Sequence, residues 1–175
     1  MWEDTEAPQG CMVEIIDGVI TVAPPRGILQ NVVVCKLQRA LYSVMPEDWG
    51  AYQKLGLAVR ARHGIYVPHL AVVPKAALSA TGHVTPAAAA ELVVEIASMG
   101  SAVHERTQKP AGYACAGVPL HLLVDKWAPG GPAVTLYGEP EGDAYRTLSA
   151  VKFGEPIHLP EPFDVTLDTA LFPAG

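Results

Sequence analysis

The chain has 175 residues and a net charge of −6; half of its residues are hydrophobic and 17% are charged. This length and composition predict one domain with a substantial core, residues 1–175, and exclude a disordered or fibrous protein. Twelve Lys and Arg against eighteen Asp and Glu disfavour general DNA binding, which usually needs an excess of basic residues, although they leave room for a local basic patch.

The cysteine count and the lack of long apolar segments indicate a cytoplasmic protein. The three cysteines are odd in number and widely spaced, as expected of reduced thiols rather than of a disulfide framework or a zinc site. No apolar run reaches membrane-spanning length, and the acidic start MWEDTEAPQG lacks the pattern of a secretory signal. We therefore expect a protein of the cytoplasm with no membrane partner.

A hairpin is the first element predicted along the chain, after a loose terminus over residues 1–10. Asp17-Gly18 is a two-residue turn between two short apolar stretches, Met12–Ile16 and Val19–Ala23, which predict strands. Glu14 alternates with apolar neighbours, so it lies on one face of the hairpin. A position on the protein surface is the simplest expectation for this residue.

A helix and several strands follow the hairpin. Apolar residues recur at helical spacing over residues 27–45, which predicts an amphipathic helix of about four turns. Residues 49–62 indicate one or two strands, and residues 65–73 a β-branched strand that Pro68 interrupts. The Ala-rich stretch 75–90 is expected to be a surface connection with room for a short helix.

The centre of the chain holds a carboxylate that needs an explanation. Glu95 lies within the apolar stretch 92–97, which predicts a buried strand, and a buried carboxylate is costly without a cation or hydrogen-bond donors. A helix expected over residues 103–116 supplies a cation, because Lys109 follows Glu95 by fourteen residues. Pro110 should bend this helix or delay its start. The pair indicates a metal-dependent site, the remnant of one, or an ion pair with a structural role alone.

The rest of the chain predicts more strands. A second buried strand is expected over residues 120–124, and two further strands over 133–137 and 145–151. The tail IHLPEPFDVTLDTALF indicates a short strand and a docking segment. The fold class is therefore α/β, a mixed β-sheet core flanked by helices, with an N-terminal hairpin.

Taken together, these pieces resemble the Uma-two family (domain of unknown function 820) of endonucleases, in the restriction-endonuclease-like superfamily. The resemblance spans nearly the whole chain, and the order and spacing of its motifs are more specific than any single motif. It rests on Glu14-x-x-Asp17-Gly18, Pro24-Pro25, Val67-Pro68, Val94-Glu95-Ile96-x-Ser98, Lys109, Tyr113, Ala116-Gly117-Val118-Pro119 and Leu123-Val124-Asp125.

The resemblance implies a restriction-endonuclease-like fold and a metal-dependent phosphodiesterase. In that superfamily an Asp after a Pro and a Glu on the next strand hold Mg²⁺ or Mn²⁺, and a Lys orients the attacking water or steadies the developing charge. Carried over by position, Glu95 is a metal ligand and Lys109 is the lysine. Glu14 is an accessory acid near the metal.

The chain departs from the family at the second acid, because Pro68-His69 stands where the family has Pro-Asp. Imidazole suits Mn²⁺ or Zn²⁺ better than Mg²⁺. His69 has three interpretations: a replacement metal ligand, a general base, or a hydrogen-bonding filler. Tyr113 either packs or turns its hydroxyl to the site. Glu105 stands where the family has an Asp, but together with His104 it has a simpler interpretation, capping and solvating the start of a helix.

Three hypotheses for the function follow. The first is a protein that still cuts or binds DNA, with a divalent ion near Glu95, Lys109, His69 and Glu14. The second is a scaffold without nuclease chemistry that binds or transforms a small molecule in an apolar pocket without a metal. In that case His69, Glu95, Lys109 and Tyr113 are acid/base or orienting residues. The third is a structural or regulatory homodimer that pairs through sheet edges.

Overall fold

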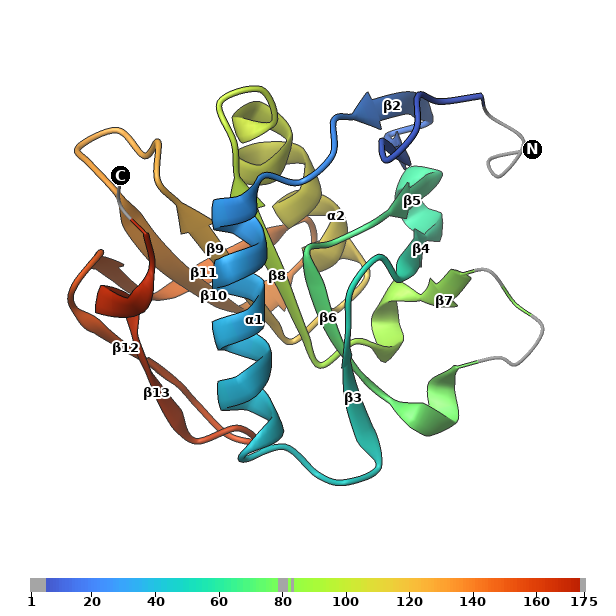
Figure 1. Ribbon diagram of the computed structural model, residues 1–175. Helices are drawn as coiled ribbons and strands as arrows, with labels where there is room; N and C mark the ends of the chain where they lie inside the picture. The colour runs from blue at the N-terminus through green and yellow to red at the C-terminus, as the bar shows by residue number, and fades with distance from the viewer. Residues whose placement is uncertain (1–5, 79–81, 83, 174–175) are drawn as a thin grey trace.

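The computed structural model describes residues 6–78, 82 and 84–173, and in this part of the chain a six-stranded sheet lies at the centre of the fold (Figure 1). The strand order is β11-β10-β9-β8-β6-β3, in which β8 and β9 are parallel and the other neighbours are antiparallel. The strands are β3 (Trp49–Tyr52), β6 (Leu70–Pro74), β8 (Leu92–Ala97), β9 (Leu120–Asp125), β10 (Ala133–Glu141) and β11 (Ala144–Lys152).

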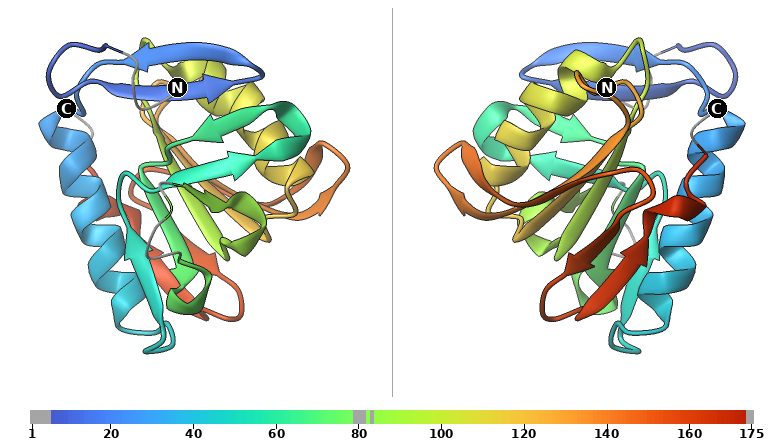
Figure 2. Two further views of the ribbon diagram at one scale, coloured as in Figure 1. Left: turned by 90° about the vertical axis from the view of Figure 1, so that its right-hand side faces the viewer. Right: turned by 90° about the vertical axis from the view of Figure 1, so that its left-hand side faces the viewer.

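A second, five-stranded sheet carries the N-terminal hairpin at its edge, in the order β2-β1-β5-β4-β7. Asp17 and Gly18 both have a positive φ, which confirms the predicted tight turn of the hairpin. Figure 2 shows this hairpin lying across one end of the molecule. The strands are β1 (Met12–Ile16), β2 (Val19–Ala23), β4 (Gly56–Val59), β5 (Gly64–Tyr66) and β7 (Val84–Pro86).

One face of the six-stranded sheet is covered by α1 (Ile28–Tyr42) and by the hairpin of β12 (Pro156–Leu159) and β13 (Val165–Asp168). Helical spacing places four apolar side chains of α1 on the sheet, and each contributes roughly 1.5–3 kcal/mol relative to an exposed position. They are Val33, Val34, Leu37 and Leu41. The predicted helix over 27–45 is therefore confirmed, with slightly shorter bounds.

The opposite face of the sheet packs against α2 (Lys109–Cys115), which is preceded by a π-helical turn, η4 (His104–Gln108). The Lys109 N–H donates to the carbonyl of His104, five residues earlier, which defines the wider turn. Helical backbone runs without a break from residue 102 through η4 to residue 115, so Pro110, which has no amide hydrogen, lies inside the helix just after the wider turn. The helix expected over residues 103–116 is confirmed, but Pro110 does not delay its start.

Alternate residues of β8 serve two different cores, because successive side chains of a strand point to opposite faces. Val94 and Ile96 belong to the core under α1, whereas Val93 belongs to the core between α2 and the five-stranded sheet. Glu95 has the parity of Val93 and bonds to side chains of α2. The sequence of β8 therefore places its one carboxylate between the two sheets.

Some predicted elements differ in extent from the observed ones. The stretch 75–90 contains β7, which pairs in parallel with β4, and Ala87 and Ala90 are buried, so it is not only a surface connection. Its residues 79–81 and 83, and residues 1–5 of the predicted loose terminus, lie outside the described residues. Strands β10 and β11 are longer than predicted because they form one bulged hairpin. The short 3₁₀ turns are η1 (Arg60–Arg62), η2 (Lys75–Ala77), η3 (Ala87–Ala89) and η5 (Thr169–Leu171).

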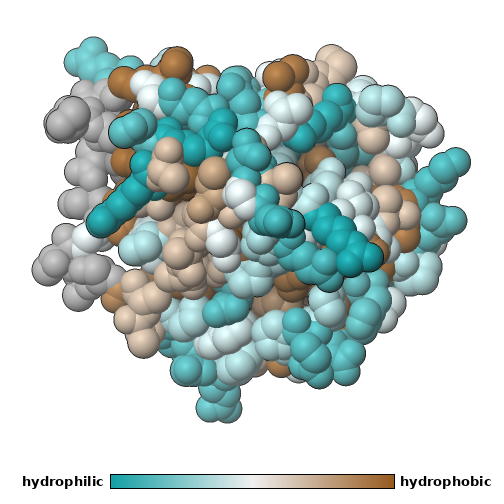
Figure 3. Space-filling view, turned by 180° about the vertical axis from the view of Figure 1, so that it is seen from behind, coloured by the Kyte–Doolittle hydropathy of each residue, from teal (hydrophilic) through white to brown (hydrophobic). Residues whose placement is uncertain are grey.

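The surface seen from behind carries many hydrophilic residues, with hydrophobic ones interspersed (Figure 3). Elsewhere, the edge strand β2 exposes three large apolar side chains, those of Val19, Ile20 and Val22. Among the described residues, no helix combines the length and the apolar character that crossing a bilayer requires.

Candidate active site

Glu95 on β8 is completely buried, and three side chains stabilise its carboxylate. Lys109 Nζ lies 3.1 Å from Oε1, and the Tyr113 hydroxyl donates to the same oxygen at 2.7 Å. His69 Nδ1 lies 2.8 Å from Oε2. Burial alone would raise the pKa of Glu95, but the charge of Lys109 and the bond from His69 outweigh it and hold the pKa well below its usual range. Glu95 is therefore ionised at pH 7.

Lys109 joins Glu95 to the N-terminal hairpin. Its Nζ lies 2.8 Å from Glu14 Oε1, and that oxygen also accepts the Val67 N–H at 2.6 Å. Glu14 is buried, so the expected surface position is wrong: the alternation of β1 turns this side chain inward, toward α2. Burial disfavours the Lys109 cation, but Glu95 and Glu14 outweigh this and raise its pKa above the usual value. Lys109 therefore stays protonated and cannot serve as a base at neutral pH.

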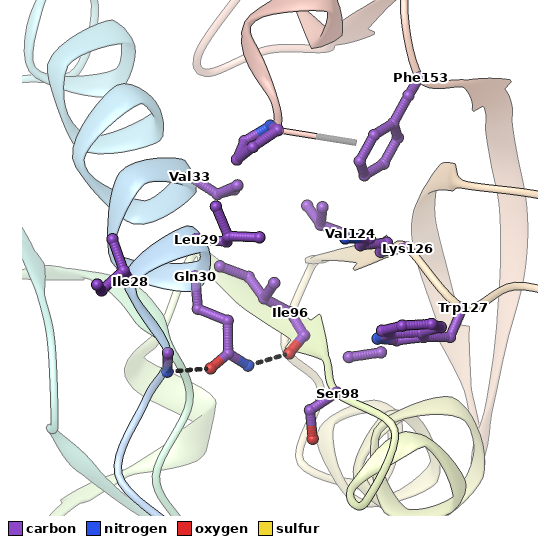
Figure 4. A pocket seen from close by; sticks show the side chains of 13 residues that line it. Ile28, Leu29, Gln30, Val33, Ile96, Ser98, Val124, Lys126, Trp127 and Phe153 are labelled. Carbon is purple, nitrogen blue, oxygen red and sulfur yellow. Dashed lines mark hydrogen bonds between the residues drawn. The ribbon is translucent and has the colours of Figure 1, made fainter. Parts of the chain in front are cut away.

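Gln30 on α1 reaches across to the end of β8, as Figure 4 shows. Its amide also contacts His69, on the side opposite Glu95. Its Oε1 accepts the Gly27 N–H at 2.9 Å, so the amide nitrogen must be the atom that faces the sheet. This nitrogen donates to the carbonyl of Ile96 at 3.0 Å and lies 3.2 Å from His69 Nε2. The nitrogen Nε2 of His69 therefore acts as an acceptor.

These contacts assign the tautomer of His69. Because Glu95 is ionised and Gln30 donates to Nε2, the ring proton lies on Nδ1 and is donated to Glu95. The Ile96 N–H also approaches Nδ1, at 3.3 Å, but a protonated nitrogen cannot accept this bond. Burial lowers the pKa of His69 and outweighs the effect of Glu95, so the ring is neutral at pH 7.

Glu105 on η4 is the residue whose role the sequence did not reveal. It is buried, so the interpretation as a solvated cap is wrong; its Oε2 accepts a hydrogen bond from the Ser101 hydroxyl at 2.8 Å. Burial and the nearby charge of Glu95 raise the pKa of Glu105 to about 8. The one feature of the sequence that pointed to Glu105 was its position, because the family that this chain resembles has an Asp there. Glu105 therefore carries a proton at pH 7 as long as no further cation is near.

Three carboxyl groups share two cations in this centre. The carboxyl groups of Glu14, Glu95 and Glu105 meet one buried cation, Lys109, and the half-buried guanidinium of Arg26. Arg26 donates to the carbonyls of residues 68 and 69 at 2.8 and 3.1 Å, and its Nε has no partner within the described residues. Burial raises the pKa of Glu14 as well; the charge of Lys109 opposes this rise and the charge of Glu95 adds to it. Burial is therefore the largest cause of both raised pKa values, and the charge of Glu95 adds to it.

The residues that meet here have the ligand types of a divalent ion, and an ion would replace one of the two hydrogen bonds of His69. One ligand atom each from His69, Glu95 and Glu105 lie within 4.8 Å of one another, a closeness that no other trio of His, Cys, Asp or Glu reaches in the described part of the chain. An ion at this point would balance the excess negative charge that appears when all three carboxyl groups are ionised. One imidazole with two carboxylates suits Mn²⁺ or Zn²⁺ better than Mg²⁺, which prefers oxygen ligands. Glu14 lies outside this trio and bonds to Lys109.

A cavity of about 510 Å³ gives access to the centre between the hairpin, the start of α1 and η4. His69, Glu105, Lys109 and Glu14 line it, whereas Glu95 and Tyr113 do not. A bound molecule would therefore touch the first four side chains. Glu95 lies beneath them and holds His69 and Lys109 in place.

The five site residues predicted from the sequence meet in one network: Glu14, His69, Glu95, Lys109 and Tyr113. Their catalytic and metal-binding roles stay predictions. Sequence reasoning gave no site role to three further members of the network, Arg26, Gln30 and Glu105. Arg26 and Gln30 carry only a weak signal, two polar residues around the first turn of an apolar helix after a Pro-Pro pair.

Comparisons with known proteins agree with the resemblance seen in the sequence. The family model Uma2, described as "Putative restriction endonuclease", matches residues 2–170. The fold is similar to the crystal structure of a protein from Anabaena variabilis, described as "a putative nuclease belonging to DUF820". The TM-score is 0.69 at 18% sequence identity, over 91% of this chain and 89% of that one. The predicted α/β fold with its N-terminal hairpin is thereby confirmed. A comparison with curated proteins gave no match.

Proposed function

We propose, from the premise that this chain belongs to the Uma2 family of restriction-endonuclease-like proteins, that its polar centre hydrolyses phosphodiester bonds with a divalent transition-metal ion. The observation that carries this proposal is the trio of His69, Glu95 and Glu105 next to a protonated Lys109. A bound ion would act as a Lewis acid and lower the pKa of a water molecule. His69, Glu95 and Glu105 would hold that ion.

The side chains of this protein have separate tasks under this proposal. Lys109 stays a cation and lines the cavity, so it is suited to steady negative charge on a phosphoryl oxygen. Glu95 is ionised and lies beneath the cavity wall; besides acting as a ligand from below, it would orient Lys109 through Oε1. Glu105 holds a proton at pH 7 without an ion, so loading the site at that pH must release protons.

The replacement of an aspartate by His69 gives the proposal a sharp test. Purified protein, freed of metal with EDTA, is offered supercoiled plasmid and bis(4-nitrophenyl) phosphate with Mg²⁺, Mn²⁺, Co²⁺ or Zn²⁺. We expect hydrolysis with a transition ion to exceed hydrolysis with Mg²⁺ by about tenfold or more, because imidazole suits those ions better. Ion binding is measured separately by calorimetry at pH 7 in two buffers, which also counts the protons released.

Matched variants complete the test. His69→Asp should shift the preference toward Mg²⁺, whereas the same substitution at the exposed His158, His158→Asp, should leave the preference unchanged. Glu105→Gln should weaken ion binding and abolish proton release. Hydrolysis that proceeds equally without any ion, or a preference that His69→Asp does not move, would contradict the proposal.

A further inference from the structure

A second cavity, of about 220 Å³, adjoins the polar centre on the α1 side of β8 (Figure 4). Gly27, Gln30 and Ser98 line both cavities, and Gln30 is the residue that holds His69 Nε2. The remaining wall is mostly apolar. It includes Ile28, Leu29, Val33, Ile96, Val124, Trp127 and Phe153.

Trp127 forms one wall of the cavity, and hydrogen bonds to residues outside the cavity hold its backbone in position. The Trp127 N–H donates to Asp125 Oδ1 at 2.9 Å, and its carbonyl accepts a bond from Arg106 at 2.6 Å. Arg106 also forms a bidentate pair with Asp125, at 2.6 and 3.1 Å. The backbone that carries the indole is therefore held before any ligand arrives, and a preformed wall lowers the entropic cost of binding.

Large apolar side chains stay open to solvent around this cavity. Ile28 is 81% exposed and Trp127 is 47% exposed, although both line a hollow that an apolar molecule could fill. Exposed apolar residues that surround a concave site are typical of ligand-binding surfaces.

The polar groups of the cavity restrict the chemistry of a ligand. The side-chain amide of Gln30 already forms hydrogen bonds with Gly27, Ile96 and His69. The Ser98 hydroxyl is hydrogen-bonded to the Ser101 hydroxyl. A nucleobase needs free donors and acceptors along its edge, so these walls do not match one.

Lys126 is the one charged residue of the lining, and its Nζ lies 5.3 Å from the centre of the Trp127 ring. Among the described residues it forms no ion pair. The cavity therefore offers an apolar interior and one cation.

We propose that this cavity binds a small amphipathic anion, with an aliphatic or aromatic body between α1 and Trp127 and a carboxylate or phosphate group at Lys126. An apolar cavity of about 150 Å³ accommodates benzene, so the space here suits a body of about eight carbon atoms. Because Gln30 lines both cavities, only its side chain separates the apolar part of the bound ligand from His69. Binding requires no metal ion, so it does not depend on the proposed hydrolysis.

Octanoate is the first probe, titrated in EDTA by calorimetry and by tryptophan fluorescence. Acetate has the charge without the body, octan-1-ol has the body without the charge, and octyl phosphate tests the other anionic group. We expect octanoate to bind at least about tenfold more tightly than acetate, because burying methylene groups is favourable by about 0.8 kcal/mol each. Octan-1-ol should bind more weakly than octanoate, and the tighter of octanoate and octyl phosphate identifies the anionic group.

Two variants connect this binding to the cavity. Lys126→Met should weaken octanoate binding several-fold and leave octan-1-ol unchanged, whereas Lys36→Met, on α1 but outside the cavity lining, should change neither. Val33→Phe should fill the space and weaken both ligands; its fold is checked by circular dichroism. The proposal is overturned if octanoate binds no more tightly than acetate, or if Lys126→Met leaves its affinity unchanged.

Nuclear magnetic resonance of the imidazole nitrogens tests whether the two cavities communicate. Octanoate in EDTA should shift the His69 Nε2 signal, because Gln30 contacts both this nitrogen and the ligand cavity. The signals of His158, which is exposed and lines neither cavity, should stay unchanged. Equal shifts at both residues would show that octanoate acts nonspecifically.

Discussion

His69 and His121 are both buried histidines next to the same sheet, yet their surroundings are opposite. His69 exchanges hydrogen bonds with Glu95 and Gln30. His121 on β9 contacts three aromatic rings, those of Tyr113, Tyr137 and Tyr145, with ring centres 5.5 to 5.9 Å away. Within the described residues neither ring nitrogen of His121 has a partner.

The two regions meet at Tyr113, whose hydroxyl belongs to one and whose ring belongs to the other. Burial lowers the pKa of both histidines, and that of His121 falls to about 4. Burial and a shifted pKa therefore do not single out the candidate catalytic histidine. What distinguishes His69 is its set of partners and its access to a cavity.

The largest expected effect comes from removing the cation of the polar region. Lys109→Met leaves Glu14 and Glu95 buried without their partner, and the free energy of unfolding should fall by about 3–5 kcal/mol. Arg146→Met breaks an exposed pair with Glu139 and should change stability little. Urea unfolding at pH 7 measures both variants. Equal losses would show that the buried network contributes no more than a surface ion pair.

Exchanging each histidine for leucine tests the comparison directly. His69→Leu leaves a donor of Gln30 and an acceptor of Glu95 without a partner, which should cost about 1–3 kcal/mol. His121→Leu removes two unsatisfied nitrogens from an apolar site, so stability should stay within about 1 kcal/mol or rise. The difference between the two unfolding midpoints in urea is the measurement. A larger loss at His121 would contradict the distinction between the regions.

The smallest expected effect is a pH dependence that arises from Glu105. Its pKa of about 8 in the folded protein exceeds the ordinary 4.5, so the folded state keeps a proton that the unfolded chain releases. This stabilisation is complete below pH 4.5 and is lost as the pH rises through 8. The two histidines act in the opposite direction, but only below their ordinary pKa of 6.5.

Between pH 6.5 and 8, in EDTA, the free energy of unfolding should therefore fall by about 1 kcal/mol per pH unit. Glu105→Gln should remove most of this slope, and Glu141→Gln, at an exposed position, should retain it. A slope that is the same in both variants would assign the effect to other groups.

The sequence predicted those parts of the fold that depend on local pattern. The turn at Asp17-Gly18, the apolar β8 and the helix over residues 103–116 follow from neighbouring residues, and all three are confirmed. The spacing of Glu95 and Lys109 also identified the central ion pair.

The rest of the site depends on contacts that no local pattern contains. Gln30 meets His69 across 39 positions of the chain, and Glu14 meets Val67 across 53. Only the packing of α1 and of the hairpin brings these groups together. The burial of Glu105 depends on the π-helical turn. The residue types in η4 do not predict such a turn.

Because of this turn, the position of Glu105 beside His69 and Glu95 depends on the number of residues in η4. A helix that bonds five residues back holds one residue more per turn than one that bonds four back. If the same residues wound as an ordinary α-helix, Glu105 would be rotated by about 100° relative to Lys109, whereas deleting one residue of η4 would restore ordinary winding and keep the two side chains in their present relation. When related chains are aligned, the number of residues between Ser101 and Lys109 is thus as informative about this acid as the letter at position 105.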